Sequence, residues 1–374
     1  MMEPQDILSQ LSFAAENPRK MLEAQLAQGK KVVGCFPSYT PEELVDAAGM
    51  VPFGVWGAQM EPYLAKKYLP VFACPILQSS LEMGLSGKLK DLSAVIIPTL
   101  CDTFRCITQD WLAGVPDIPM IPVSYPQNRT DAGIQFLRYE FETVKNKLEA
   151  ICGHSITEEA LENSIRVYNE HTAVMREFTA IANEHLDIID PVARHHVMKS
   201  AWFMSKAEHT RLMRELISSL KATQPHHFKG RRVLLSGIAA EPDSLLQILT
   251  DNNVAVVGDD LAQESRQYTA PIPEGQGDPL LRLAGKWRGQ LCSLAHDEGK
   301  GRVDMLVDMA NVTSADGMIF CQMKFCDPEE YDYPLISRAL KEIGVPTLCL
   351  EVDQQPGSTE QIRTRLQTFA EMLG

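Results

Sequence analysis

The stretch Lys30-Lys31-Val32-Val33-Gly34-Cys35-Phe36 is a short apolar run, and Thr40-Pro41-Glu42-Glu43 follows it closely. The first stretch has the length and composition of a buried strand. The second is typical of a helix that begins with a capping box at Thr40. A strand followed directly by a helix is the repeating unit of a parallel sheet, so we expect an α/β fold from this point of the chain outward.

The same alternation continues along the N-terminal part of the chain. Further apolar runs and helical stretches follow one another, with strands expected at Val51–Trp56, Ser93–Leu100 and Pro119–Tyr125 and helices at Cys74–Gly84 and Asp102–Ala113. Strands that alternate with helices indicate a parallel sheet. We therefore predict a first α/β domain over residues 1–130.

Beyond this domain the periodicity changes. Residues 131–222 follow a nearly continuous helical pattern, which predicts a helical region over 131–228 that ends in the breaker-rich segment Gln224–Gly230. A second strand–helix series then begins, with strands at Arg231–Gly237, Val254–Gly258, Gly317–Gln322 and Val345–Val352 and helices starting near Pro242, Pro328 and Ser358. The expected architecture is thus two open parallel-sheet domains, of Rossmann or flavodoxin-like type, with a helical insert between them and the second domain at 229–374.

Size, composition and charge limit the classes of function. The 374 residues exceed the length of roughly 250–300 at which a single core stops growing, which agrees with more than one domain. A net charge of −14 disfavours nucleic acid or an anionic membrane as the main partner. No run approaches the roughly 20 apolar residues that span a bilayer, and the acidic start Met1–Asp6 does not resemble a signal peptide. We expect a cytoplasmic protein.

The nine cysteines are the candidate functional residues. An odd number in a long chain without a signal peptide disfavours a disulfide framework and favours thiol, metal or cluster chemistry. Four of them stand where a strand gives way to a helix start, namely Cys35, Cys74, Cys101 and Cys326. A thiol near a helix N-terminus faces the positive end of the helix dipole, which favours the thiolate. Three others are expected in the core, namely Cys106, Cys321 and Cys349.

Cysteine spacing alone leaves two interpretations open. Cys101 and Cys106, like Cys321 and Cys326, are separated by four residues, but the tighter C-x2-C units of zinc ribbons and ferredoxins are absent. Two open α/β sheets commonly hold a ligand in the crevice at their strand ends. A ligand set of Cys74 and Cys101 from one domain and Cys326 from the other is therefore one hypothesis. The alternative is that all of these thiols are core residues.

Other motifs carry less information. Gly299-Lys300-Gly301 is a fragment of a phosphate loop, and neither a complete loop of that kind nor H-E-x-x-H occurs. We expect the pairs His195-His196 and His226-His227 to be polar surface or linker residues. Acidic residues beside the expected helix start near Pro328 are interpreted as complements of the helix dipole, namely Glu329, Glu330 and Asp332.

Several longer strings resemble a known family. They are Lys31–Gly34 through Trp56-Gly57, Cys101-Asp102-Thr103, Pro126–Arg129, Asp259-Asp260 with Glu264-Ser265-Arg266, and Phe325–Glu330. The resemblance is to the small (beta) subunit of (R)-2-hydroxyacyl-CoA dehydratases, and it covers nearly the whole chain. Met323–Cys326 and Arg363–Phe369 resemble most the variants that act on 2-hydroxyisocaproyl-CoA, lactoyl-CoA and phenyllactoyl-CoA.

The resemblance implies a cofactor and partners. It implies a 4Fe-4S cluster held by Cys74, Cys101 and Cys326, at the cleft between the domains, with Cys35 left out. It also implies a homologous alpha subunit, in a heterodimer or a dimer of heterodimers, and a separate ATP-hydrolysing iron–sulfur activator protein. Three cysteines leave the fourth iron position open, and we expect Cys35 to be structural or merely near the cluster. Which other groups take part in catalysis stays open.

The implied reaction is the radical elimination of water from an (R)-2-hydroxyacyl-CoA to give the 2-enoyl-CoA. One injected electron forms a ketyl radical anion and is recycled, and the substrate binds mainly to the partner subunit. Two rival functions remain at this point. One is a subunit of a benzoyl-CoA-type reductase with the same ligands, and the other is a bilobed small-molecule binding protein without a cofactor.

Overall fold

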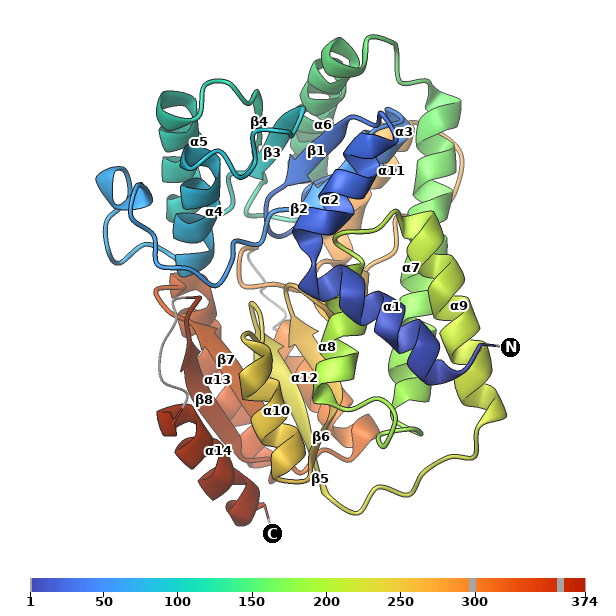
Figure 1. The fold of residues 1–374 in the computed structure, drawn as a ribbon, viewed down its shortest axis with the longest axis vertical. Coiled ribbons are helices and arrows are strands. Elements are labelled where there is room, and N and C mark those ends of the chain that lie inside the picture. Colours follow the sequence, from blue (N-terminus) through green and yellow to red (C-terminus); the bar gives the residue numbers. More distant parts are fainter. Residues whose placement is uncertain (1, 296–300, 355–359, 374) are drawn as a thin grey trace.

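The computed structural model describes residues 2–295, 301–354 and 360–373. It contains two four-stranded sheets in which every strand pairing is parallel. Figure 1 shows the N-terminal sheet above the C-terminal sheet, with a group of long helices beside them. This arrangement confirms the predicted α/β fold.

The first sheet has the order β2-β1-β3-β4. Its strands are β1 (Val32–Cys35), β2 (Val51–Gly54), β3 (Ala94–Pro98) and β4 (Met120–Val123). Every residue of β1, β2 and β3 is buried, as expected for a parallel sheet covered on both faces. Helix α2 (Pro18–Ala27) precedes β1, and the helices between the strands are α3 (Glu42–Ala47), η1 (Ala65–Lys67), α4 (Pro75–Leu85) and α5 (Asp102–Gly114).

The second sheet repeats this topology with the order β6-β5-β7-β8. Its strands are β5 (Arg231–Gly237), β6 (Val254–Leu261), β7 (Gly317–Met323) and β8 (Thr347–Val352). Its helices are α10 (Asp243–Asp251), η2 (Ser265–Tyr268), α11 (Pro279–Gly285), η3 (Lys286–Gly289), α12 (Gly301–Thr313), α13 (Asp327–Glu342) and α14 (Glu360–Met372). The predicted start near Ser358 lies outside the described residues.

Four helices form the predicted helical region, namely α6 (Asp131–Cys152), α7 (Glu158–Ala182), α8 (Pro191–Ser200) and α9 (Lys206–Ala222). Each begins at a side-chain cap, provided by Thr130, Thr157, Asp190 and Ser205. The first helix of the chain, α1 (Pro4–Glu16), packs its buried Ile7 and Leu11 into a core shared with α7, α8 and α9. Figure 1 shows α1 lying across these helices. None of the described helices is both long enough and apolar enough to cross a bilayer.

The predicted capping box at Thr40 is wrong. Helix α3 begins at Glu42, its N-cap is Pro41, and no side chain caps it. The Thr40 hydroxyl instead donates to the Phe36 carbonyl oxygen at 2.8 Å. Ser38 and Tyr39 have positive φ angles of 64° and 63°, so the chain makes an additional tight turn before the helix. Sequence signals describe only the helix start and not this turn.

Candidate metal centre

Both sheets have a topological switch point on their central strands. β1 lies between β2 and β3, and β5 lies between β6 and β7, so consecutive connections leave these strands in opposite directions. Open α/β sheets bind ligands just beyond the strand ends at such points. A cavity of about 470 Å³ lies there, lined in part by residues that follow β1, β3, β5 and β7, namely Pro37, Ser38, Leu100, Cys101, Ile238, Phe325 and Cys326.

Three predicted cysteines share this cavity. Cys74, Cys101 and Cys326 all line it, and each is the N-cap residue of a helix, of α4, α5 and α13 respectively. The predicted position between a strand and a helix is therefore confirmed for Cys101 and Cys326, whereas Cys74 precedes a helix but follows the η1 segment and a loop rather than a strand. The free backbone N–H groups of a first helical turn point toward the N-cap side chain. Three helix N-termini from two domains thus converge on one cavity.

Burial outweighs these helix N-termini in setting the pKa values of the thiols. Burial raises the pKa of Cys74 to about 12, although the N–H groups of Ile76 and Leu77 lower it. Burial also raises the pKa of Cys101, and it raises that of Cys326 well above the usual range, with the neighbouring Cys74 adding to the effect. The helix N-termini favour the thiolates as expected, but burial outweighs this contribution. A metal cation is the agent that deprotonates clustered cysteines outright.

The spacing of the thiols distinguishes a cluster from a single ion. Ligand atoms around one tetrahedral ion, with metal–sulfur bonds of about 2.3 Å, lie roughly 4 Å apart. Among the described residues, the group of three ligand atoms found within 4.8 Å of one another lies elsewhere and contains no cysteine. The soft thiol donors, their wider spacing and the size of the cavity fit an iron–sulfur cluster better than one ion.

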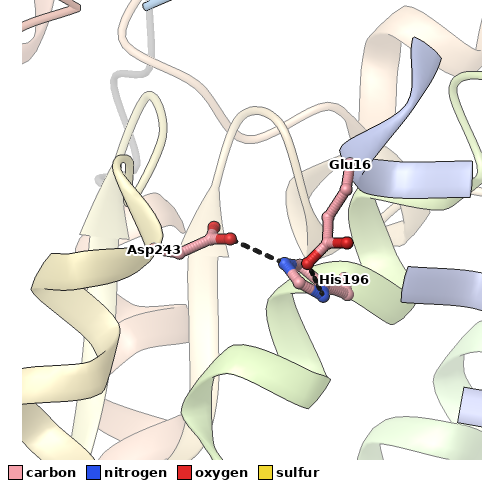
Figure 2. A group of neighbouring side chains, drawn as sticks. All are labelled: Glu16, His196 and Asp243. Atoms are coloured by element: carbon pink, nitrogen blue, oxygen red, sulfur yellow. Dashed lines mark hydrogen bonds and ion pairs between the residues drawn. The ribbon is translucent and has the colours of Figure 1, made fainter. Parts of the chain in front are cut away.

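That other group consists of Glu16, His196 and Asp243. Nε2 of His196 lies 2.9 Å from an Asp243 carboxylate oxygen, whereas Nδ1 lies 3.0 Å from the Ser12 hydroxyl and 4.0 Å from Glu16. Figure 2 shows the imidazole between the two carboxylates, with an interaction drawn to each. Its two nitrogens therefore face different partners, which suits a hydrogen-bonded link between α1, α8 and α10 rather than a metal site. The hydrogen bond from His196 lowers the pKa of Asp243 to about 2.

The expectation of a surface role for His195-His196 is wrong. His195 is 1% exposed and His196 is 5% exposed, and Nδ1 of His195 lies 2.7 Å from Glu264. Both side chains are buried because α8 packs between α1 and the second sheet. Local sequence patterns do not predict this packing. His226-His227 is exposed, as predicted.

The remaining cysteines lie apart from the three N-cap thiols. Cys35 is fully buried, lies outside the described lining of the cavity, and has its sulfur 3.7 Å from the Val33 carbonyl oxygen. Cys321 is in the core as predicted, and Cys349 is partly buried. Cys106 is exposed, so its expected core position is wrong: it lies on a face of α5 that no other described element covers.

A ring of buried charges lies next to Cys326. Arg266 binds Asp260 at 2.8 Å and Glu329 at 2.9 Å, and Arg302 binds the same two carboxylates at 2.9 and 2.8 Å. The Asp260, Glu329, Arg266 and Arg302 side chains are at most 4% exposed. Burial opposes ionisation of Glu329, but Arg266 and Arg302 lower its pKa to about 2.

Glu329 lies in the first turn of α13, three residues after Cys326, which agrees with its interpretation as a complement of the helix dipole. The structure adds that its carboxylate is buried and forms ion pairs with Arg266 and Arg302. Asp332 also binds Arg302, at 2.7 Å, whereas Glu330 is exposed as expected. The signal that could have found the ring is the pair of strings Asp259-Asp260 and Glu264-Ser265-Arg266, which contain Asp260 and Arg266 and carry part of the family resemblance.

A second, smaller cavity of about 70 Å³ is lined by the next residues of the same loop, Tyr39 and Thr40. Aromatic side chains form much of its wall, namely Tyr125, Tyr168, Trp202, Tyr268 and Trp287. Its charges are paired, with Glu42 and Lys206 2.9 Å apart and Glu43 and Lys286 3.3 Å apart. It lies where both sheet domains and the helical region meet.

Comparison with known proteins supplies the family. The model of the family "2-hydroxyglutaryl-CoA dehydratase, D-component" matches residues 37–373. The chain is 47% identical to the lactoyl-CoA dehydratase beta subunit of Anaerotignum propionicum, covering 98% of each chain. It is 46% identical to the (R)-phenyllactyl-CoA dehydratase beta subunit of Clostridium sporogenes, covering 96% of each. It is 25% identical to one of the subunits of benzoyl-CoA reductase from Thauera aromatica, covering 92% of this chain and 91% of that one.

Fold and site together define a class of protein: two parallel α/β domains with three N-cap cysteines in a shared cavity. The chain belongs to the 2-hydroxyglutaryl-CoA dehydratase D-component family. The match spans both sheets and the helical region, so it rests on the whole fold rather than on one motif.

Proposed function

We propose that this chain is the beta subunit of an (R)-2-hydroxyacyl-CoA dehydratase and that Cys74, Cys101 and Cys326 hold a 4Fe-4S cluster. The observation that carries the proposal is the meeting of three N-cap cysteines in one cavity at the switch points of both sheets. Related chains named as dehydratase beta subunits share 47% and 46% of their residues with it. The bound cluster would supply one-electron transfer for the loss of water from the substrate.

The residues of this chain have defined tasks in that role. The first-turn N–H groups of α4 and α5 face Cys74 and Cys101 and stabilise negative charge on sulfur. Burial of the three thiols limits access of water to the site. Glu329, tied to two arginines, fixes the first turn of α13 and with it the position of Cys326.

The proposal also includes two protein partners. The beta-subunit names of the relatives imply an alpha subunit. Coenzyme A is polyanionic, and a chain with net charge −14 is suited to leaving most of the thioester to such a partner. The chain has no complete phosphate-loop motif, so we assign ATP hydrolysis to a separate activator protein that delivers the electron.

The experiment that tests this function is anaerobic co-expression with the neighbouring reading frames. We expect a coloured complex with about four irons and four sulfides per cluster. With the activator and ATP, it should convert a 2-hydroxyacyl-CoA to the enoyl-CoA with far fewer electrons than product molecules. An iron-free complex would favour the bilobed binding protein without a cofactor and would contradict the proposal.

The related benzoyl-CoA reductase defines the second candidate function. A reductase of this type consumes electrons in proportion to product, so the ratio of electrons to product separates the two activities. The lower identity of 25%, against 47% and 46%, favours the dehydratase. The two dehydratase relatives act on lactoyl-CoA and phenyllactyl-CoA according to their names, so a panel of 2-hydroxyacyl-CoAs has to determine the acyl chain.

A further inference from the structure

Ser38 is the remaining polar group that the fold buries at the cysteine cavity. It follows β1, the central strand of the first sheet, and lines the cavity with Cys74, Cys101 and Cys326. The residue is only 6% exposed. Its hydroxyl oxygen is not one of the fully buried unpaired atoms, so it keeps access to the cavity, and the described residues offer it no hydrogen bond.

The backbone at Ser38 is also in an unfavourable conformation. Its φ of 64° lies in the left-handed region, which glycine occupies without penalty and which is unfavourable for other residues. The next residue, Tyr39, has a φ of 63°, so two consecutive residues accept this conformation. Strain of this kind persists where the side chain or the turn has a role. Here the turn places a small hydroxyl side chain in the wall of the cavity that Cys74 and Cys101 also line.

Most of the other polar side chains at the cavity either have a hydrogen-bond or ion-pair partner or are exposed to solvent. The Ser293 hydroxyl donates to Glu329 at 2.8 Å. The Asp102 side chain is 96% exposed and pairs with Arg105. Gln127, Asp327 and Tyr331 are exposed.

Thr103, in the first turn of α5, is only partly buried, and it lies beside Cys101, whose sulfur already takes one ligand position. Ser38 is thus the most buried residue of the described lining whose side-chain oxygen has no hydrogen-bond partner among the described residues.

We propose that the Ser38 hydroxyl contacts the iron position that the three cysteines leave open. This inference rests on the proposed function, because it takes the three cysteines as ligands of a four-iron cluster. Cys35 is excluded from that position because its sulfur lies outside the described lining of the cavity. An oxygen contact is weaker for iron than a thiolate, so the fourth iron stays more exchangeable than the other three.

Three variants test the role of Ser38 in the anaerobically purified complex. Ser38→Gly removes the hydroxyl and is conformationally favoured at this φ, so the fold is retained. Ser38→Cys places a thiolate at the same position. Thr103→Val removes the other uncommitted hydroxyl and is the matched control. The readouts are iron content, the rate at which a chelator removes one iron after mild oxidation, and the electron paramagnetic resonance signal of the resulting 3Fe-4S form.

We expect Ser38→Gly to lose the fourth iron roughly tenfold faster than the wild type, the scale usual for groups that support metal binding. Ser38→Cys should lose it at least tenfold more slowly, with no thiol at residue 38 open to alkylation in the loaded protein. Thr103→Val should match the wild type. Wild-type rates in both Ser38 variants, or the Ser38→Gly effect in Thr103→Val alone, would overturn this inference. An iron-free wild-type complex would overturn the proposed function as well.

Discussion

The loop that follows β1 separates two cavities with opposite chemistry. On one side, three thiols face a cavity of about 470 Å³ without a described positive side chain bound to them. On the other, Glu42 and Glu43 are each paired with a lysine around a cavity of about 70 Å³, which has room for several ordered waters. The first cavity therefore has soft thiol donors without a charged partner among the described residues, which is why we propose a metal cluster there. In the second cavity the acidic side chains are already paired with lysines, so they hold the two sheet domains and the helical region together.

The largest expected effect comes from removing a thiol of the first cavity. Cys74→Ser, Cys101→Ser and Cys326→Ser should each abolish the charge-transfer absorbance of the cluster, because serine is a poor replacement for a soft thiolate. Cys106→Ser and Cys349→Ser, at the outer face of α5 and on β8, are the controls and should keep it. A full cluster in Cys326→Ala would contradict the assignment of Cys326 as a ligand, and with it the proposed metal site in the first cavity.

A second test asks whether this chain needs a partner subunit for dehydratase activity. We expect size analysis under anaerobic conditions to show a complex with a homologous larger subunit, because this chain has no evident coenzyme A or nucleotide motif. Omitting that subunit should remove the dehydratase activity. Full activity from this chain and the activator alone would contradict the proposed division of work.

The next largest effect is expected at the charge ring beside Cys326, where we predict a loss of folding stability. Glu329→Gln leaves Arg266 and Arg302 partly uncompensated in the interior, and breaking a buried pair costs about 3–5 kcal/mol in the free energy of unfolding. Urea unfolding of the cluster-free chain at pH 7 measures this loss. Glu330→Gln, on the exposed side of the same turn, is the control and should change stability by less than about 0.5 kcal/mol.

The pH dependence of the same variants gives an independent check. The pKa of Glu329 is lowered to about 2 in the folded chain, below the value of about 4.3 in an unfolded one. Its contribution to stability is therefore present above pH 4.3 and is lost as the pH falls toward 2. The stability difference between wild type and Glu329→Gln should shrink over this interval. A difference that stays constant would show that the carboxylate charge is not responsible.

A smaller effect is expected at the second cavity. Glu42→Gln removes one partner of the buried pair with Lys206 and should lower the free energy of unfolding by about 2–3 kcal/mol, without changing iron content. The double variant Glu42→Gln with Lys206→Met should recover part of this loss, because no unpaired charge is left behind. Loss of the cluster in Glu42→Gln would show that the two cavities are coupled.

The smallest effect is expected at Cys35. Cys35→Ala should leave iron and sulfide content unchanged, because the thiol is fully buried outside the described lining of the cysteine cavity. Only the reduction potential should change, through altered packing and polarity near the cluster. Loss of one iron, or a 3Fe-4S spectrum in this variant, would show that Cys35 is a ligand.

Local signals determined much of the fold. The runs predicted as strands at Lys30–Phe36 and Arg231–Gly237 contain β1 and β5, which lie inside their sheets and are largely buried. The run at Val345–Val352 contains the edge strand β8, which is only partly buried. The sequence also placed Cys74, Cys101 and Cys326 at helix starts, since proline and aspartate mark such starts clearly.

Tertiary structure alone decided which groups meet. The order of the strands in each sheet, set by long-range pairing, brought Cys101, Cys326 and Ser38 to one cavity and kept Cys35 out of it. Packing of α8 buried His195 and His196, and two arginines distant in sequence form buried ion pairs with Glu329 that its place in a helical first turn does not predict. A chain pattern records periodicity and caps over a few residues. Burial and charge pairing depend on elements far apart in sequence, and only the packed fold fixes those.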